Sequence, residues 1–181
     1  METAKVHRRA ARRRALQCVF ALSFHRFESA EQVRQAFLGL PVNDDDEDAP
    51  GQASGSDEAG KSRSALPQVT DGLAPLPEDQ EFGLGLVTGV FSRLDEIDAV
   101  IRRFSKHWKI ERIAKAELSI LRLGVYELLY EPEIPLRVSI NEAVELSKEF
   151  ADDNSFPFVN GILDAVARAV SHGEFGIRKQ F

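Results

Sequence analysis

The sequence predicts an all-α protein, folded as a compact helical bundle. Apolar residues recur three and four positions apart in several segments, which is the period of an amphipathic helix. No segment shows the alternating pattern of a strand between hairpin turns. Hydrophobic residues make up 43% of the 181 residues, which is enough for the core of one domain. We therefore expect about five to seven helices around a single core.

Residues 1–40 are expected to hold two helices. In the first, apolar residues recur at helical spacing from Leu16 through Phe20 and beyond. A second, shorter helix can start at Glu28 or Ser29, and the Gly-Leu-Pro sequence that follows it would end it.

A polar linker is expected at residues 41–77. It opens with an acidic run, Asn43 to Asp48, and continues with proline, glycine, serine, alanine and charged residues. This composition offers too little apolar surface to offset the entropy lost on ordering. We therefore predict a disordered acidic insertion here.

Residues 78–173 are expected to form the helical core. Pro77 precedes a helix whose first turn is acidic, as the helix dipole favours. Glycines from Gly83 to Gly89 indicate close helix packing and allow for a division of this segment into two helices. Apolar residues surround the whole helical wheel of the segment 110–130, which places that helix at the centre of the bundle.

Two more helices are expected in the last third of the chain. The spacing of Ser139 and Glu142 is that of a capping box, which would start the first of them. Pro157 stands where it could start the last helix. The chain is expected to fray at residues 174–181, after a single domain of residues 1–173.

The strongest charge feature is the arginine-rich start of the chain. The formal net charge is −6, so nucleic-acid binding would have to come from a local basic cluster. Arg8 and Arg12 are four apart, as are Arg9 and Arg13, and such pairs project from a helix in rows that suit RNA phosphates. The alternative is an unstructured basic tail, but the arginines run directly into the first amphipathic helix, which favours binding. DNA is less favoured, because no groove-reading module is evident.

No catalytic, metal or cofactor site is evident in the sequence. The four histidines are scattered, and none stands at metal-ligand spacing from another ligand. Cys18 is the only cysteine, and its apolar neighbours indicate a packing role. The glycines at 83–89 do not follow a nucleotide-binding spacing. We therefore predict a protein that is not an enzyme and needs no metal or cofactor.

The protein is expected to be soluble and cytoplasmic. No apolar run approaches the roughly 20 residues of a membrane-spanning helix. The start of the chain also lacks the apolar stretch of a secretory signal. We expect no contact with a membrane.

Aromatic residues that could stack on nucleic-acid bases are Trp108, Tyr126, Tyr130, Phe156 and Phe158. Each is by default expected in the core. Phe156 is the expected exception, because it follows a polar loop and could expose its ring to a base.

Four blocks of sequence follow one another at residues 120–128, 134–135, 138–148 and 158–164. In order and spacing they resemble the signature of the NusB family of transcription antitermination factors, and the resemblance covers residues 82–168 well. It implies an all-helical fold of two small helical subdomains. It also implies that the protein, together with the small-subunit ribosomal protein NusE, binds single-stranded boxA RNA in nascent rRNA transcripts and helps RNA polymerase resist termination.

The resemblance further implies an RNA-binding surface and a partner-binding surface. The RNA-binding surface falls on Arg8, Arg9, Arg12, Phe20, Asn154 and Phe158, and Arg13 extends it on another face of the helix. Phe20 stands where many members have tyrosine, and Ala10 interrupts the arginine run, so the contacts are expected to differ in detail. Phe158 is expected to lie half in the core. Glu117 matches a position that faces NusE, with an ordinary solvated carboxylate as the open alternative.

Two other functions fit the same residues. One is an RNA-binding module of an rRNA methyltransferase system, whose catalytic part would have to be another polypeptide. The other is a helical adaptor or homodimer that binds only proteins. Salt separates them from each other, because binding through several arginines weakens steeply with salt and binding through an apolar interface does not.

Overall fold

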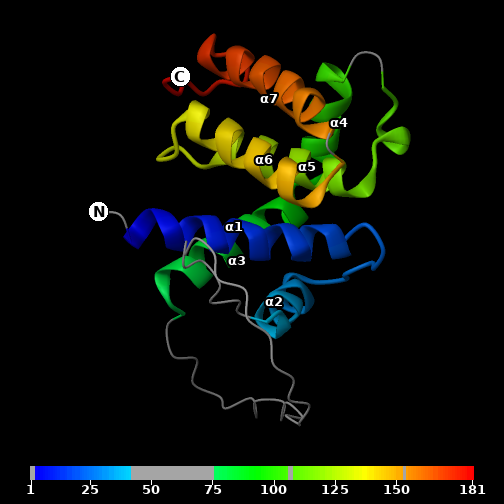
Figure 1. The fold of residues 1–181 in the computed structure, drawn as a ribbon, viewed down its shortest axis with the longest axis vertical. Coiled ribbons are helices and arrows are strands. Elements are labelled where there is room, and N and C mark those ends of the chain that lie inside the picture. Colours follow the sequence, from blue (N-terminus) through cyan, green and yellow to red (C-terminus); the bar gives the residue numbers. More distant parts are fainter. Residues whose placement is uncertain (1–2, 42–75, 106–107, 153) are drawn as a thin grey trace, which may run out of the picture.

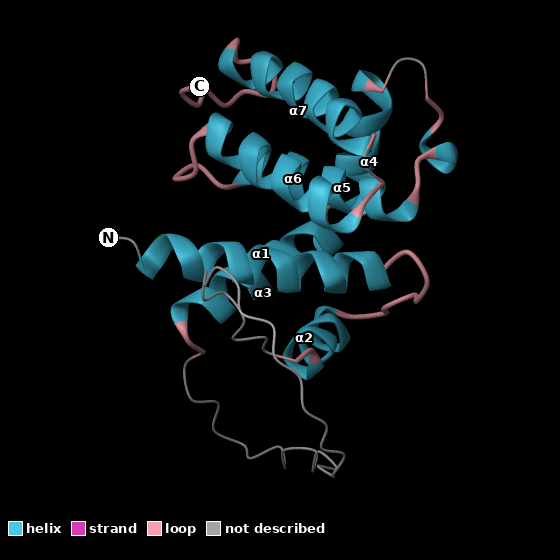
Figure 2. Ribbon diagram, viewed as in Figure 1, coloured by secondary structure: helices cyan, strands magenta, loops and turns pink. Residues whose placement is uncertain are grey.

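The computed structural model describes residues 3–41, 76–105, 108–152 and 154–181, and side chains of the first helix from Arg8 onward. These residues form seven α-helices, one short 3₁₀ helix and no strand (Figure 2), which confirms the predicted all-α class. The predicted linker at 41–77 lies almost wholly outside the described residues, so its disorder stays a prediction. In the described part of the chain, no helix is long and apolar enough to cross a membrane.

The helices fall into two layers that meet along the first helix (Figure 1). One layer contains α1, α2 and α3, and the other contains α4 to α7. In chain order the elements are α1 (Thr3–Ala21), α2 (Ala30–Gly39), α3 (Glu78–Ser92), α4 (Leu94–Phe104), η1 (Ile110–Arg112), α5 (Lys115–Tyr130), α6 (Leu136–Phe150) and α7 (Ser155–Ser171). This arrangement confirms the expected two small helical subdomains.

The central helix, α5, joins the two layers. It packs against α4, α6 and α7 on one side and against α1 and α3 on the other. All of its residues from Leu118 to Leu129 are buried, as the apolar pattern around its helical wheel predicted. The core is therefore continuous from one subdomain to the other.

Several predicted helix boundaries are confirmed. Ser29 precedes α2, and its Oγ accepts a hydrogen bond from the backbone N–H of Gln32. The glycine-containing segment that begins after Pro77 divides into two helices, α3 and α4, at Arg93. In the apolar segment 110–130, the first three residues form η1, and α5 begins only at Lys115.

Two predicted helix starts are wrong. The helix α6 begins at Leu136, three residues before Ser139, so Ser139 and Glu142 do not form a capping box. The Ser139 hydroxyl instead donates a hydrogen bond to the buried side chain of Glu127, at 3.2 Å. The last helix begins at Ser155 rather than at Pro157.

Two glycines of α3 allow neighbouring helices to come close, as predicted. A Cβ on Gly83 would lie 2.8 Å from the ring of Phe37 on α2 and 3.1 Å from the carbonyl oxygen of Ala11 on α1. A Cβ on Gly89 would lie 2.1 Å from the ring of Tyr126 on α5. A side chain at either position would push these helices apart.

The C-terminal tail beyond α7 packs against the fold. The Lys179 ammonium donates hydrogen bonds to the carbonyl oxygens of Glu127 and Glu131, at the C-terminal end of α5. The backbone N–H of Leu136, the first residue of α6, donates to the carbonyl oxygen of Gln180. The segment expected to fray thus supplies partners to polar groups at the ends of two helices.

Candidate nucleic-acid interface

The arginines of α1 divide into an inner group and an outer group. Alanine, arginine and leucine are strong helix formers, which explains why this charged segment is helical. Because α1 lies between α3 and α6, arginines on its different sides meet different neighbours (Figure 1). Their roles therefore have to be assigned one side chain at a time.

Arg12 is the inner arginine, with only 4% of its surface exposed. Its Nε and Nη2 atoms donate to the two carboxylate oxygens of Glu127, at 2.7 and 3.0 Å. Burial alone would lower the pKa of the guanidinium, but the hydrogen bonds and charge of Glu127 outweigh it and the pKa is raised. The planar guanidinium also lies over the ring of Phe82, 5.3 Å from its centroid.

This enclosure changes the role expected for Arg12. The predicted RNA contact would require an exposed guanidinium, and here the residue is 4% exposed, its nitrogens face Glu127 and Glu142, and the Phe82 ring covers one face. We therefore move Arg12 from the RNA-contacting residues to those that hold α1 against α5. The RNA-binding prediction is carried forward for the other arginines.

The outer group consists of Arg8, Arg9 and Arg13, which we call the α1 edge. Arg9 lies 3.8 Å from Glu142 and 3.7 Å from Glu145, both on α6. Arg13 donates from Nε to Glu149, one turn further along α6, at 2.9 Å. Arg8 is exposed and lies over the Phe82 ring, 5.4 Å from its centroid. Arg9 and Arg13 thus line the boundary between α1 and α6, and the exposed Arg8 lies beside Phe82 of α3.

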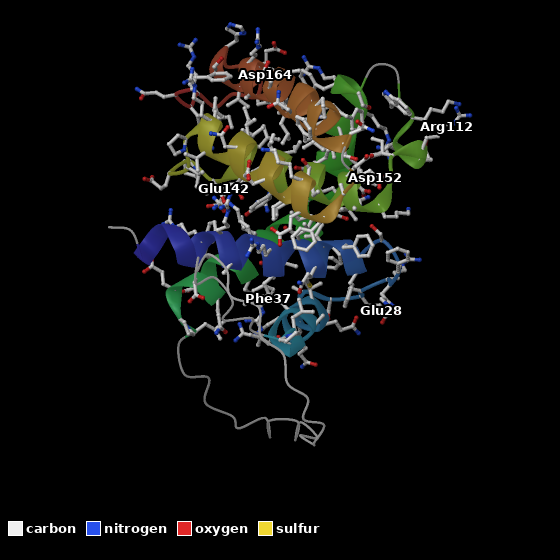
Figure 3. All side chains as sticks on the ribbon, viewed as in Figure 1. Glu28, Phe37, Arg112, Glu142, Asp152 and Asp164 are labelled. Atoms are coloured by element: carbon white, nitrogen blue, oxygen red, sulfur yellow. The ribbon has the colours of Figure 1, made fainter. Side chains whose placement is uncertain are left out.

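The glutamates that face the α1 edge were not identified from the sequence. Glu142, Glu145 and Glu149 lie three and four residues apart, so they project from one face of α6, and Figure 3 shows Glu142 between α6 and α1. The spacing was visible, but nothing in the sequence indicated that this face would meet arginines. Exposed ion pairs of this kind contribute little to stability, so a phosphate can take the place of a carboxylate.

The Arg14 side chain contacts α2 and the residue that follows it. Its Nη2 atom donates to the carbonyl oxygens of Leu38 and Leu40, at 3.2 and 2.9 Å. Its guanidinium also lies over the ring of Phe37, 4.7 Å from the centroid. A cation at this position satisfies carbonyl groups at the C-terminal end of α2.

The turn between α6 and α7 presents an amide and aromatic rings. Asn154 is exposed immediately before α7. Phe156 is 39% exposed, as expected for a ring available to bases, and the ammonium of Lys148 lies 5.8 Å from its centroid. Phe158 is partly buried, in agreement with its expected half-core position, and its ring meets that of Trp108 edge-on at 5.8 Å.

The other aromatic residues take different places. Tyr126 is buried as expected, whereas Trp108 is 57% exposed and is not a core residue. Phe20 is 38% exposed at the C-terminal end of α1, and its ring lies 5.0 Å from that of Phe24, which is 62% exposed. Exposed rings therefore lie at the end of α1 and beside the α6–α7 turn.

Glu117, the residue predicted to face a partner, lies in the first turn of α5 and is partly buried. Its carboxylate accepts a hydrogen bond from the hydroxyl of Ser155, the first residue of α7. Glu117 thus fixes the start of α7 and, with it, the position of the α6–α7 turn. Its contact with a partner stays a prediction.

Among the described residues, no group of histidine, cysteine, aspartate or glutamate side chains could hold a metal ion. Cys18 is buried in α1, and burial raises the pKa of its thiol to about 11. A thiol with this pKa is protonated at neutral pH and is a poor nucleophile. The geometry supports binding and does not indicate covalent catalysis at Cys18.

Comparisons with known proteins agree with the fold and with the sequence resemblance. The model of the NusB family matches residues 9–168. The transcription antitermination protein NusB of Nitratidesulfovibrio vulgaris (strain DP4) is 40% identical over 167 residues, which cover 92% of each chain. The T. maritima NusB structure matches with a TM-score of 0.64 and 28% identity over 89% of this chain and 90% of that one. A crystal structure of the antitermination factors NusB and NusE in complex with dsRNA matches with a TM-score of 0.61 and 23% identity, over 90% and 97% of the two chains.

Proposed function

The chain belongs to the NusB family, and on that basis we propose that it is a transcription antitermination factor that binds boxA-type RNA together with the ribosomal protein NusE. Members of this family are antitermination proteins and not enzymes. In this proposal the protein acts in the cytoplasm on nascent rRNA transcripts, as part of the complex that helps RNA polymerase resist termination.

The observation that carries the proposal is the row of accessible cations on the α1 edge. In this proposal Arg8, Arg9 and Arg13 contact phosphates, and the exposed carboxylates of Glu145 and Glu149, which face Arg9 and Arg13, are exchanged for phosphate oxygens. Phosphate contacts give affinity and orientation without reading the sequence. Sequence recognition needs other groups nearby.

The α6–α7 turn supplies groups of that kind. The exposed amide of Asn154 can donate to and accept from base edges, and the rings of Phe156 and Phe158 can stack on unpaired bases. Phe20 adds a further exposed ring at the end of α1. Base faces inside a duplex are covered by neighbouring base pairs, whereas those of a single strand are open to rings. We therefore propose a single-stranded RNA, although the solved NusB–NusE complex with the same fold contains double-stranded RNA.

The proposed partner surface includes the first turn of α5 around Glu117. This carboxylate holds the start of α7 through Ser155, so a partner that docks on α5 would also fix the turn that contacts RNA. Such coupling would explain why the two ligands are bound together. Binding of each ligand should strengthen binding of the other by the same factor.

An RNA titration with and without NusE tests the proposal. We compare the wild type with Arg8→Gln/Arg9→Gln/Arg13→Gln, and we use Arg34→Gln/Arg168→Gln/Arg178→Gln as a control with the same change in net charge but on α2, the far end of α7 and the tail. The α1-edge variant should bind boxA-type RNA more weakly, and the slope of log K against log salt should fall by about 0.7 for each lost phosphate contact.

The control variant separates a specific surface from general attraction. It should bind RNA almost as tightly as the wild type, with the same circular dichroism spectrum. Equal affinities of all three proteins in the presence of NusE would overturn the RNA-binding role of the α1 edge. NusE binding that persists without any RNA affinity would instead indicate a helical adaptor that binds only proteins.

A further inference from the structure

We propose that Trp108, with the cations Lys109 and Arg112 that follow it, extends the RNA-binding surface beyond the α6–α7 turn. The indole would stack on one base, and the two cations would contact the flanking phosphates. This inference rests on the proposed function, since it concerns the same single-stranded RNA. It assigns a binding role to a residue that the sequence pattern placed in the core.

The Trp108 side chain is unusually exposed. More than half of the residue, 57%, is exposed, which is rare for a large apolar ring without a ligand or partner. Its backbone is held in place by Ser105, because the Trp108 N–H donates to the Ser105 carbonyl at 2.7 Å and the Ser105 hydroxyl donates to the Trp108 carbonyl at 3.1 Å. Ser105 itself is buried. The indole is thus exposed while the Trp108 backbone is bonded to a buried residue.

A second aromatic ring, that of Phe158, lies beside the indole. The Phe158 ring meets the indole edge-on, with 5.8 Å between centroids and 67° between ring planes. This contact supports the indole from one side, and 57% of the residue stays exposed. Two adjacent aromatic rings at an angle to each other are suited to hold consecutive unstacked bases.

Two positively charged residues follow Trp108 in the sequence. Lys109 and Arg112 are both exposed, and in the described part of the chain neither lies within ion-pair distance of a carboxylate. They differ in this from Arg9 and Arg13, which face the glutamates of α6. Two exposed cations that have no carboxylate partner among the described residues, close in sequence to an exposed indole, favour a ligand that carries both phosphates and bases. We therefore infer RNA here rather than an apolar protein segment.

The region around Trp108 is also continuous with the surface already described. Phe158 follows Asn154 on the first turn of α7, and Lys148, which lies over Phe156, also donates a hydrogen bond to Glu145, a partner of Arg9. Figure 3 shows Arg112 at the same edge of the molecule as Asp152, which lies in the α6–α7 turn. A single strand that follows the α1 edge to this turn would reach Trp108 next.

Tryptophan fluorescence tests the inference directly, because Trp108 is the only tryptophan of the chain. A single-stranded boxA-type RNA oligonucleotide is titrated into the protein with and without NusE, and the same titration of Trp108→Phe serves as the blank. RNA should quench the indole emission in both cases. Inorganic polyphosphate, which has charge but no bases, should not quench it at equal ionic strength.

Affinity measurements separate stacking from charge. Trp108→Ala should bind RNA about 5- to 150-fold more weakly, the range expected for the loss of one base–aromatic stack, and Trp108→Phe should recover part of the loss. Lys109→Gln/Arg112→Gln should lower the slope of log K against log salt by about 1.4. The control Arg34→Gln/Arg178→Gln, with the same charge change far from Trp108, should leave the slope unchanged.

The outcomes distinguish this inference from the proposed function. If the α1-edge variant loses affinity while Trp108→Ala binds RNA like the wild type and the emission does not change, the extension is wrong and the proposed function stands. If the indole responds to NusE alone and not to RNA, Trp108 belongs to a protein interface and the inference is also overturned. If wild-type protein with NusE binds no RNA, the proposed function itself fails.

Discussion

The two sides of α1 carry the same kind of residue in opposite circumstances. On the inner side, the Arg12 guanidinium is enclosed by Glu127, Glu142 and Phe82, and the residue is 4% exposed. One residue further on, Arg13 pairs with Glu149 at the surface, with 34% of its side chain exposed. The comparison shows that the environment, and not the residue type, decides whether an arginine holds the fold together or remains available to a ligand.

The energies of the two ion pairs differ in how they depend on solvent. Removal of one partner from a buried pair leaves an uncompensated charge in the interior, which is strongly destabilising. An exposed pair is screened by water and salt, and its loss costs little. The inner side should therefore be sensitive to substitution in stability, and the outer side mainly in binding.

The largest effect is expected from Arg12→Ala. The Glu127 carboxylate would stay buried with the Ser139 hydroxyl as its one side-chain donor among the described residues. The free energy of unfolding should therefore fall by about 3–5 kcal/mol in urea denaturation. The double variant Arg12→Met/Glu127→Met removes both charges and should recover most of that loss. A loss below about 1 kcal/mol for Arg12→Ala would place this pair with the surface pairs and remove the contrast.

A second, smaller effect concerns alkaline pH and another inner residue of α1. Burial raises the pKa of the Cys18 thiol from its ordinary 9.0 to about 11 in the folded state. The unfolded chain therefore loses this proton first, so the contribution of Cys18 to stability is complete below pH 9 and declines as the pH rises to about 11.

Urea denaturation across this pH range measures the decline, and Cys18→Ala should make it less steep. Burial also raises the pKa of Tyr126 and of Tyr130, which leaves part of the decline in the variant. Burial lowers the pKa of Lys179, which acts in the opposite direction. Parallel profiles for the wild type and Cys18→Ala would mean that the thiol is accessible to water in the folded protein.

The smallest effect on stability is expected on the outer side. Arg13→Gln and Glu149→Gln should each change the free energy of unfolding by less than about 1 kcal/mol. Their effects on RNA should have opposite signs, because Arg13→Gln removes a phosphate contact whereas Glu149→Gln removes a competitor of the phosphate. We expect Glu149→Gln to bind RNA about two- to five-fold more tightly, as measured by titration at low salt. If both variants weaken binding equally, the glutamate assists RNA binding instead of competing with it.

The helices could be predicted from local patterns because each pattern has a local cause. The apolar residues around α5 require burial on every side, and Ser29 caps α2 through a bond to a residue three positions away. The arginine-rich start could likewise be identified as one cluster. These features need no knowledge of what lies across the fold.

The assignment of individual residues could not be predicted in the same way. Arg12 and Glu127 are 115 residues apart, so nothing near Arg12 in the sequence indicates that it would be buried. The Ser139 hydroxyl bonds to the same carboxylate from within α6, so it does not cap the start of that helix as the local pattern predicted. Trp108 was expected in the core because large rings usually are, whereas the structure exposes it beside Phe158.

Gly83 and Gly89 of α3 also affect the proposed RNA-binding surface. At these two positions α3 has no side chain. The helices α1 and α2 therefore pack directly against the backbone at Gly83, and the Tyr126 ring of α5 packs against the backbone at Gly89. The absence of side chains at Gly83 and Gly89 therefore sets how close α1 and α5 can each lie to α3. A single methyl group at Gly89, remote from any proposed ligand, would shift the alignment of the cationic row with the aromatic turn.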